Sequence, residues 1–152
     1  MSRYELVLFV HVLAAGAWFG AALLSLALLE LAARARERAW IVRFGEFDDQ
    51  LAKVLFIPAA LLVLAAGIAL VLDGPWSFRE DGWATGGLVL LVAIFALGLG
   101  LIVPAGQRLT ALAREGAGDD LMDAQLRRLR MLSWIDVGLL AAAFFLMTTK
   151  PF

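Results

Sequence analysis

Four long apolar segments constrain the fold of this chain more than any other feature of its sequence. A transmembrane helix needs about 20 consecutive, mostly apolar residues, and the stretches that meet this length are residues 4–31, 51–72, 83–104 and 131–149. Inside lipid each backbone N–H and C=O must be bonded within its own segment, which favours helices, and no stretch alternates as barrel strands do. The sequence predicts an all-α, four-helix transmembrane bundle, running up-down-up-down as one domain over residues 1–152.

The composition of the chain indicates the same environment. Hydrophobic residues make up 62% of the sequence and charged residues 18%, whereas soluble domains contain about 45–50% apolar residues. We therefore expect the lipid bilayer to be its main partner. The net charge of −1 comes without a basic tail, which argues against nucleic-acid binding. The absence of cysteine excludes disulfides, iron–sulfur clusters and thiolate metal sites.

Lysine and arginine are distributed unevenly over the segments between the predicted helices. From the N-terminus to the C-terminus these segments carry one, five, one, five and one basic residues, when Lys53 at the start of the second span is counted with the first loop. Basic residues accumulate on the cytoplasmic side of a membrane, so the first and third loops should face the cytoplasm and both termini the outside. Tryptophans are typical of membrane interfaces, and they lie near the expected inner boundary (Trp40 and Trp134) and outer boundary (Trp76 and Trp83).

Breaker residues predict where the helices end. The sequence DGP at residues 73–75 should end the second helix, and Pro104 with Gly106 should end the third. In the third loop, residues 121–130 have the pattern of a separate short amphipathic helix at the membrane surface. A solvated turn is the alternative interpretation of that segment.

Two pairs of small residues have the spacing that lets membrane helices approach closely. They are Gly16 with Gly20 and Ala96 with Gly100. We expect these pairs to pack helices within the bundle, and a face for a homodimer is the alternative.

Few ionisable residues fall within or near the predicted spans. Glu30, Lys53, Arg108 and Asp136 should lie at a similar depth near the inner surface, where they would neutralise one another as a polar cluster. A proton or ion pathway through Asp136 is the alternative. Near the outer surface we expect an ion pair between Lys150 and Glu5.

His11 is the one histidine of the chain, and it lies inside the first apolar segment. Neutral imidazole is a good ligand of haem iron, and a methionine can fill the opposite axial position. Met147 should lie at a similar depth to His11, and Trp18 shares the helical face of His11. A bond to a backbone carbonyl, a metal or haem site at His11, and a contact between two copies of His11 remain open. Copper is disfavoured because its centres usually use several nitrogen or sulfur ligands.

Two short motifs resemble those of a group of small bacterial integral membrane proteins. The stretch LVLFVHVLAAGAWFGAALL is similar to their first helix, which carries a His followed by Trp-x-Gly, here His11, Trp18 and Gly20. The ending WIDVGLLAAAFFLMTTKPF resembles an uncharacterised four-helix family that closes with Met-x-x-Lys-Pro, here from Met147 to Pro151. The group includes the membrane domain of copper-resistance protein D and the HemJ-type haem proteins. This resemblance implies a bacterial inner-membrane protein in which His11 ligates haem.

Three functional hypotheses follow from the sequence. The leading one is a membrane protein that holds a b-type haem near the outer leaflet through His11. The second is a structural or partner subunit without a cofactor, and the third is a small transporter or channel that uses Asp136. The sequence contains no nucleophilic triad, phosphate loop or zinc motif, so it leaves open whether the chain is an enzyme.

Overall fold

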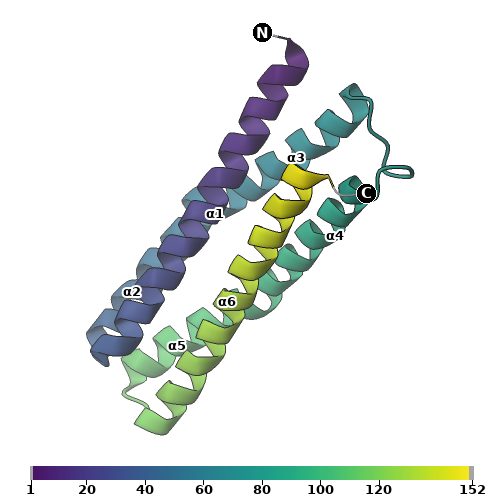
Figure 1. The fold of residues 1–152 in the computed structure, drawn as a ribbon. Coiled ribbons are helices and arrows are strands. Elements are labelled where there is room, and N and C mark those ends of the chain that lie inside the picture. The colour runs from purple at the N-terminus through teal and green to yellow at the C-terminus, as the bar shows by residue number, and fades with distance from the viewer. Residues whose placement is uncertain (1, 151–152) are drawn as a thin grey trace.

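The computed structural model describes residues 2–150, so Pro151 of the C-terminal motif lies outside the described part. All of its regular elements are helical (Figure 1). They form four rods, of which two contain a π-helical turn. In chain order the elements are α1 (Arg3–Ala35); α2 (Arg38–Leu51), η1 (Ala52–Phe56) and α3 (Ile57–Asp73); α4 (Gly82–Leu97), η2 (Gly98–Ile102) and α5 (Val103–Glu115); and α6 (Asp119–Thr149).

Each of the four rods is long and apolar enough to cross a membrane. The most apolar 18-residue windows have mean hydropathies of 2.1, 2.8, 2.8 and 1.8 in chain order. This confirms the all-helical class and the four candidate spans. The rods are longer than the predicted spans, because polar and amphipathic segments continue the helices beyond the apolar windows.

The prediction that Pro104 and Gly106 end the third helix is wrong, because this rod continues to Glu115. Proline has no N–H and cannot make the bond to the carbonyl four residues earlier. The π-turn η2 ends two residues before Pro104, and the π-turn η1 ends two residues before Pro58. The wider turn absorbs the missing bond locally, so both rods pass through their prolines.

The expected short helix over residues 121–130 is the first part of α6. No breaker separates Arg130 from Met131, so the amphipathic and apolar segments form one helix, with Gly118 as its N-cap. The DGP prediction is confirmed, since α3 ends at Asp73 with Gly74 as its C-cap. At the chain's start, Ser2 and Glu5 form a reciprocal capping box that fixes the first turn of α1.

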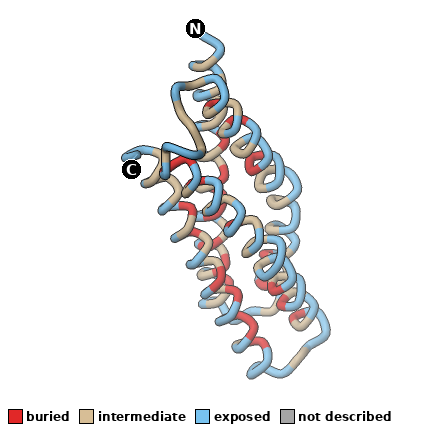
Figure 2. Tube along the Cα trace, turned by 90° about the vertical axis from the view of Figure 1, so that its right-hand side faces the viewer, coloured by how far each residue is buried: buried red, intermediate tan, exposed pale blue. Residues whose placement is uncertain are grey.

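The bundle has two ends that are packed differently. We call the end formed by α2, α5 and the adjoining halves of α1 and α6 the arginine end. Its interior is a continuous apolar core that includes Leu29, Phe44, Leu109, Met122 and Leu129. Figure 2 shows such buried positions along the faces that the helices turn towards one another.

The opposite end, which we call the cavity end, consists of α3, α4 and the other halves of α1 and α6. There α1 packs against α3, α4 packs against α6, and α1 also contacts α6. No extensive packing joins α3 to α4 in the described chain. A small core around Trp18, Ala60 and Ile94 separates this end from the arginine end.

The small-residue pairs do not lie where the sequence suggested. Gly16, Gly20, Ala96 and Gly100 are all exposed on the outside of the bundle. A Cβ added at any of the three glycines would meet no atom of another helix within 4 Å. These positions therefore do not pack the helices of the described chain together. The homodimer face stays a prediction.

Candidate functional site

An apolar cavity of about 260 Å³ lies at the cavity end, between the α1–α3 pair and the α4–α6 pair. His11, Trp18 and Met147, the three residues predicted to bind a cofactor, all line it. The structure thus brings together the three residues that were predicted to hold a cofactor. The walls are otherwise almost entirely aliphatic and aromatic.

His11 is held in one orientation by α3. Its Nδ1 donates a hydrogen bond to the carbonyl of Val63 at 3.1 Å. A neutral imidazole carries one proton, so Nε2 is left with a free lone pair. Nε2 has no hydrogen-bond partner among the described residues. Ligand histidines usually have this arrangement, in which one ring nitrogen bonds a carbonyl and the other binds a metal.

Gly67 allows His11 to approach α3 this closely. A Cβ at position 67 would lie 3.2 Å from Cε1 of His11 and 3.5 Å from its Nδ1. Glycine therefore provides the space that the imidazole occupies. Sequence reasoning missed Gly67 and Val63. A glycine in an apolar helix is a weak signal, and a backbone carbonyl gives no signal at all.

Met147 reaches the cavity from the opposite helix pair. Its Cε occupies the space beside Gly87 of α4, where an added Cβ would collide with it. Gly87 is buried and lines the same cavity. The thioether is a soft ligand that suits iron or copper. The imidazole and the thioether thus face one space from two separate helix pairs.

Trp18 forms part of the wall on the side of the small core. It is 7% exposed, and its ring lies 5.8 Å from that of Phe95 at an angle of 51°. This contact links α1 to α4 and limits the depth of the cavity. Trp18 supplies an aromatic surface against which a flat ligand can pack.

The mouth of the cavity is built from Trp76, Trp83 and Lys150. The two indole rings meet edge to face at 5.2 Å. The ammonium of Lys150 lies 4.0 Å from the centroid of Trp76 and 4.9 Å from that of Trp83. The expected ion pair between Lys150 and Glu5 is not formed, because the Glu5 carboxylate accepts the backbone N–H of Ser2 instead.

Comparison with known proteins identifies the family. The family model described as "Predicted integral membrane protein (DUF2269)" matches residues 5–151. The chain belongs to this family. The match extends over all four rods. It confirms the prediction that the chain belongs to a family of integral membrane proteins of unknown function. No curated protein and no solved structure matches the chain.

The family match does not test the resemblance of the two short motifs to better-characterised membrane proteins. The likeness to copper-resistance protein D and to the HemJ-type haem proteins stays a prediction. The described chain contains no cluster of three or more histidine, cysteine, aspartate or glutamate side chains that could hold a metal ion. A metal at His11 would need Met147 or a macrocycle to complete its ligands.

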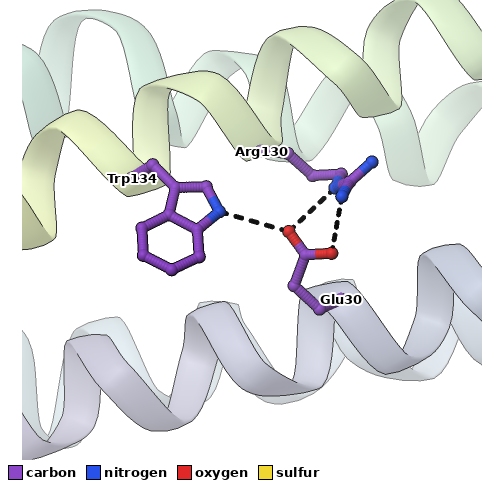
Figure 3. A network of polar contacts seen from close by, with 3 residues as sticks. All are labelled: Glu30, Arg130 and Trp134. Atoms are coloured by element: carbon purple, nitrogen blue, oxygen red, sulfur yellow. Dashed lines mark hydrogen bonds and ion pairs between the residues drawn. The ribbon is translucent and has the colours of Figure 1, made fainter.

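In this family member, the polar residues near the arginine end pair differently from the predicted cluster. Glu30 of α1 binds Arg130 of α6 through two hydrogen bonds of 2.9 and 2.7 Å, and Trp134 donates a third at 3.3 Å (Figure 3). Lys53 binds Asp49, one turn earlier on its own rod, at 2.5 Å. The cluster fails to form because α1 turns Glu30 towards α6, a rotation that depth along the helices does not reveal.

The other two members of the predicted cluster, Arg108 and Asp136, form no ion pair with a described residue. Among residues 2–150, no chain of hydrogen-bonded side chains links Asp136 to His11, whose one hydrogen bond goes to the carbonyl of Val63. Ser25, on the His11 face of α1, donates instead to Asp48 of α2 at 2.5 Å. A transport role for Asp136 therefore stays a prediction.

Proposed function

We propose that this chain is a b-type haem protein of the bacterial cytoplasmic membrane, with Nε2 of His11 as an iron ligand. One observation carries the proposal. The bond from Nδ1 to the Val63 carbonyl leaves Nε2 unprotonated on the wall of an apolar cavity. An unprotonated imidazole nitrogen is the group that binds haem iron.

The residues around His11 fit the cofactor. Met147 faces the same cavity from the opposite helix pair, and its thioether would help His11 to hold the iron. Trp18 and the aliphatic walls suit the flat apolar macrocycle. The cavity, at about 260 Å³, is slightly smaller than the 300–1,000 Å³ typical of ligand sites. Residues of both α3 and α4 line the cavity, and these two helices are not extensively packed against each other.

Bound haem would supply one-electron redox chemistry. The chain's residues would hold and orient it and exclude water. Imidazole and thioether ligation together are typical of electron-transfer haems and raise the reduction potential. An apolar shell does the same by disfavouring the more highly charged oxidised form. We therefore propose electron transfer in preference to oxygen activation.

The distribution of basic residues supports an orientation for the site. The arginine end carries most of the arginines, so we propose that it faces the cytoplasm. The helices would then run up-down-up-down with both termini outside. The cavity would lie near the outer leaflet.

The test is the visible spectrum of the purified chain. The protein is expressed in cells with ample haem, extracted in mild detergent and recorded oxidised and reduced beside His11→Ala. Asp136→Asn is the matched control, because it removes a polar group of the spans that does not line the cavity. We expect a Soret band in the wild type and the control and its loss in His11→Ala. A colourless wild type, or an unchanged band in His11→Ala, would overturn the proposal.

A further inference from the structure

We propose that Lys150, held between Trp76 and Trp83, binds the carboxylate of the molecule that occupies the cavity. The occupant would then have an apolar body and an anionic end at the mouth. The inference deepens the proposed function and rests on it for the identity of that body. In haem, the carboxylates are its propionate groups.

The two tryptophans hold the ammonium without neutralising it. Its Nζ lies 4.0 and 4.9 Å from the two ring centroids, within the range of cation–π contacts. The edge-to-face contact between the rings fixes this aromatic support. A cation–π contact leaves the full positive charge of the lysine available to an anion.

The part of the cavity wall that the structure describes contains no acidic side chain to compensate this charge. Lys150 is its one charged lining residue, and no Asp or Glu lies among the described residues of the wall. Lys150 is exposed at the edge of the cavity, so the mouth is an electropositive point beside apolar walls. An anion held between this lysine and the apolar walls is screened less than it would be in bulk water.

The carboxylates at this end of the bundle are engaged elsewhere or lie outside the cavity. Glu5 accepts the N–H of Ser2, Asp73 pairs with Arg3 at 3.2 Å, and Asp81 accepts the N–H of Ser77 at 2.7 Å. Glu80 is exposed and does not line the cavity. No described carboxylate thus occupies the place of the ligand's anion.

The position of the lysine relative to His11 sets the shape of the ligand. Tyr4 lies at the mouth, and a rise of 1.5 Å per residue places His11 roughly 10 Å deeper along α1. A molecule that reaches both ends therefore has a body that contacts His11 and a carboxylate that contacts Lys150. Porphyrins and long-chain fatty acids share this chemistry.

The test measures the contribution of the carboxylate to binding with probes that contain no iron. Protoporphyrin IX, which has no metal, and its uncharged dimethyl ester are titrated by fluorescence against the purified chain in detergent. We expect the wild type to bind the acid at least about tenfold more tightly than the ester, a free-energy difference of about 1.4 kcal/mol. Lys150→Gln should lose this preference and Lys150→Arg should retain it. Lys53→Gln is the control, because Lys53 lies in η1, does not line the cavity and pairs with Asp49.

A second pair of probes identifies the source of the carboxylate. The fluorescent fatty acid cis-parinaric acid and its methyl ester are titrated in the same way. A preference for the fatty acid that depends on Lys150, without porphyrin binding, supports the carboxylate site and assigns it to a lipid. Equal binding of acid and ester in both pairs, or binding of neither acid, overturns the proposal.

These results are independent of the His11 experiment. Loss of the Soret band tests the bond between iron and imidazole, to which the iron-free probes do not respond. A chain that prefers the acids but shows no haem spectrum would refute the haem function and keep the anion site. A chain that shows the haem spectrum but binds acids and esters equally would keep the haem function and refute the anion site.

Discussion

The arginine end and the cavity end of this bundle differ in how their interiors are filled, because the first has a closed apolar core and the second has a cavity. At the arginine end, α2 and α5 bury one apolar face each and carry charges on the other. Leu29 and Leu109 are each 1% exposed there, and the buried Gln125 donates to the carbonyl of Ala105 at 2.8 Å. Ion pairs such as Arg114–Glu46 at 2.6 Å join neighbouring helices across the surface.

At the cavity end, the helices are apolar on nearly all sides and meet in two pairs. Between the pairs lies a cavity in place of a packed core. This difference indicates that the two ends have separate roles, a division of labour between stability and ligand binding. The arginine end holds the helices together, so the cavity end can leave space for a ligand. Ligand sites commonly lie in the less stable parts of a fold.

The largest expected effect comes from shortening one leucine at each end. Leu109→Ala should lower the free energy of unfolding by about 2–5 kcal/mol, because it leaves a void in a closed core. Leu88 lines the cavity and is 37% exposed. Leu88→Ala should cost at most about 1 kcal/mol, because it enlarges an existing space. Denaturation in mixed detergent micelles, followed by circular dichroism, measures both. Equal losses would refute the division of labour.

A smaller effect should follow from breaking ion pairs. Glu30 is 18% exposed in its side chain, and its two bonds to Arg130 join α1 to α6. Glu30→Gln should cost about 1–3 kcal/mol, because a partly buried charge loses its partner.

The matched control is Lys53→Gln, which breaks an exposed pair within a single rod. An exposed pair of this spacing contributes about 0.3–0.5 kcal/mol. The same denaturation experiment at low and high salt compares the two variants. Equal costs would show that the contact between α1 and α6 does not depend on Glu30.

The fold was predictable where length and hydropathy decide it. Four apolar windows predicted four membrane-crossing helices, and the DGP sequence marked the end of α3. The passage of the chain through Pro104 was not predictable, because hydropathy does not reveal whether a π-turn can absorb a missing backbone bond.

The site was predictable only in its unusual residues. His11 and Met147 were selected because an imidazole and a thioether are the ligands that an apolar segment can offer. Their neighbours depend on how each helix is rotated about its axis. The same uncertainty explains why Gly16 and Gly20 were expected inside the bundle, whereas the glycine that contacts His11 is Gly67 of α3.

The smallest expected difference in stability between two paired variants, and the sharpest test of the cavity end, comes from two glycine-to-alanine changes. Both replacements add one methyl group to a helix and gain the same helix propensity, about 1 kcal/mol. At Gly20 the new Cβ would meet nothing within 4 Å, whereas at Gly67 it would lie 3.2 Å from Cε1 of His11. The two variants therefore differ mainly in their effect on the imidazole.

Because the chain has a single histidine, a sample labelled with ¹⁵N-histidine gives one pair of ring-nitrogen signals. We expect the wild type and Gly20→Ala to show the Nδ1–H tautomer that the bond to Val63 requires. Gly67→Ala should shift or broaden the Nδ1 signal and weaken haem binding about tenfold, the size of effect seen when a ligand histidine loses its supporting contact. Identical spectra for all three chains would mean that His11 does not need the space beside Gly67. The close approach of α1 to α3 would then serve packing, with no role in orienting the imidazole.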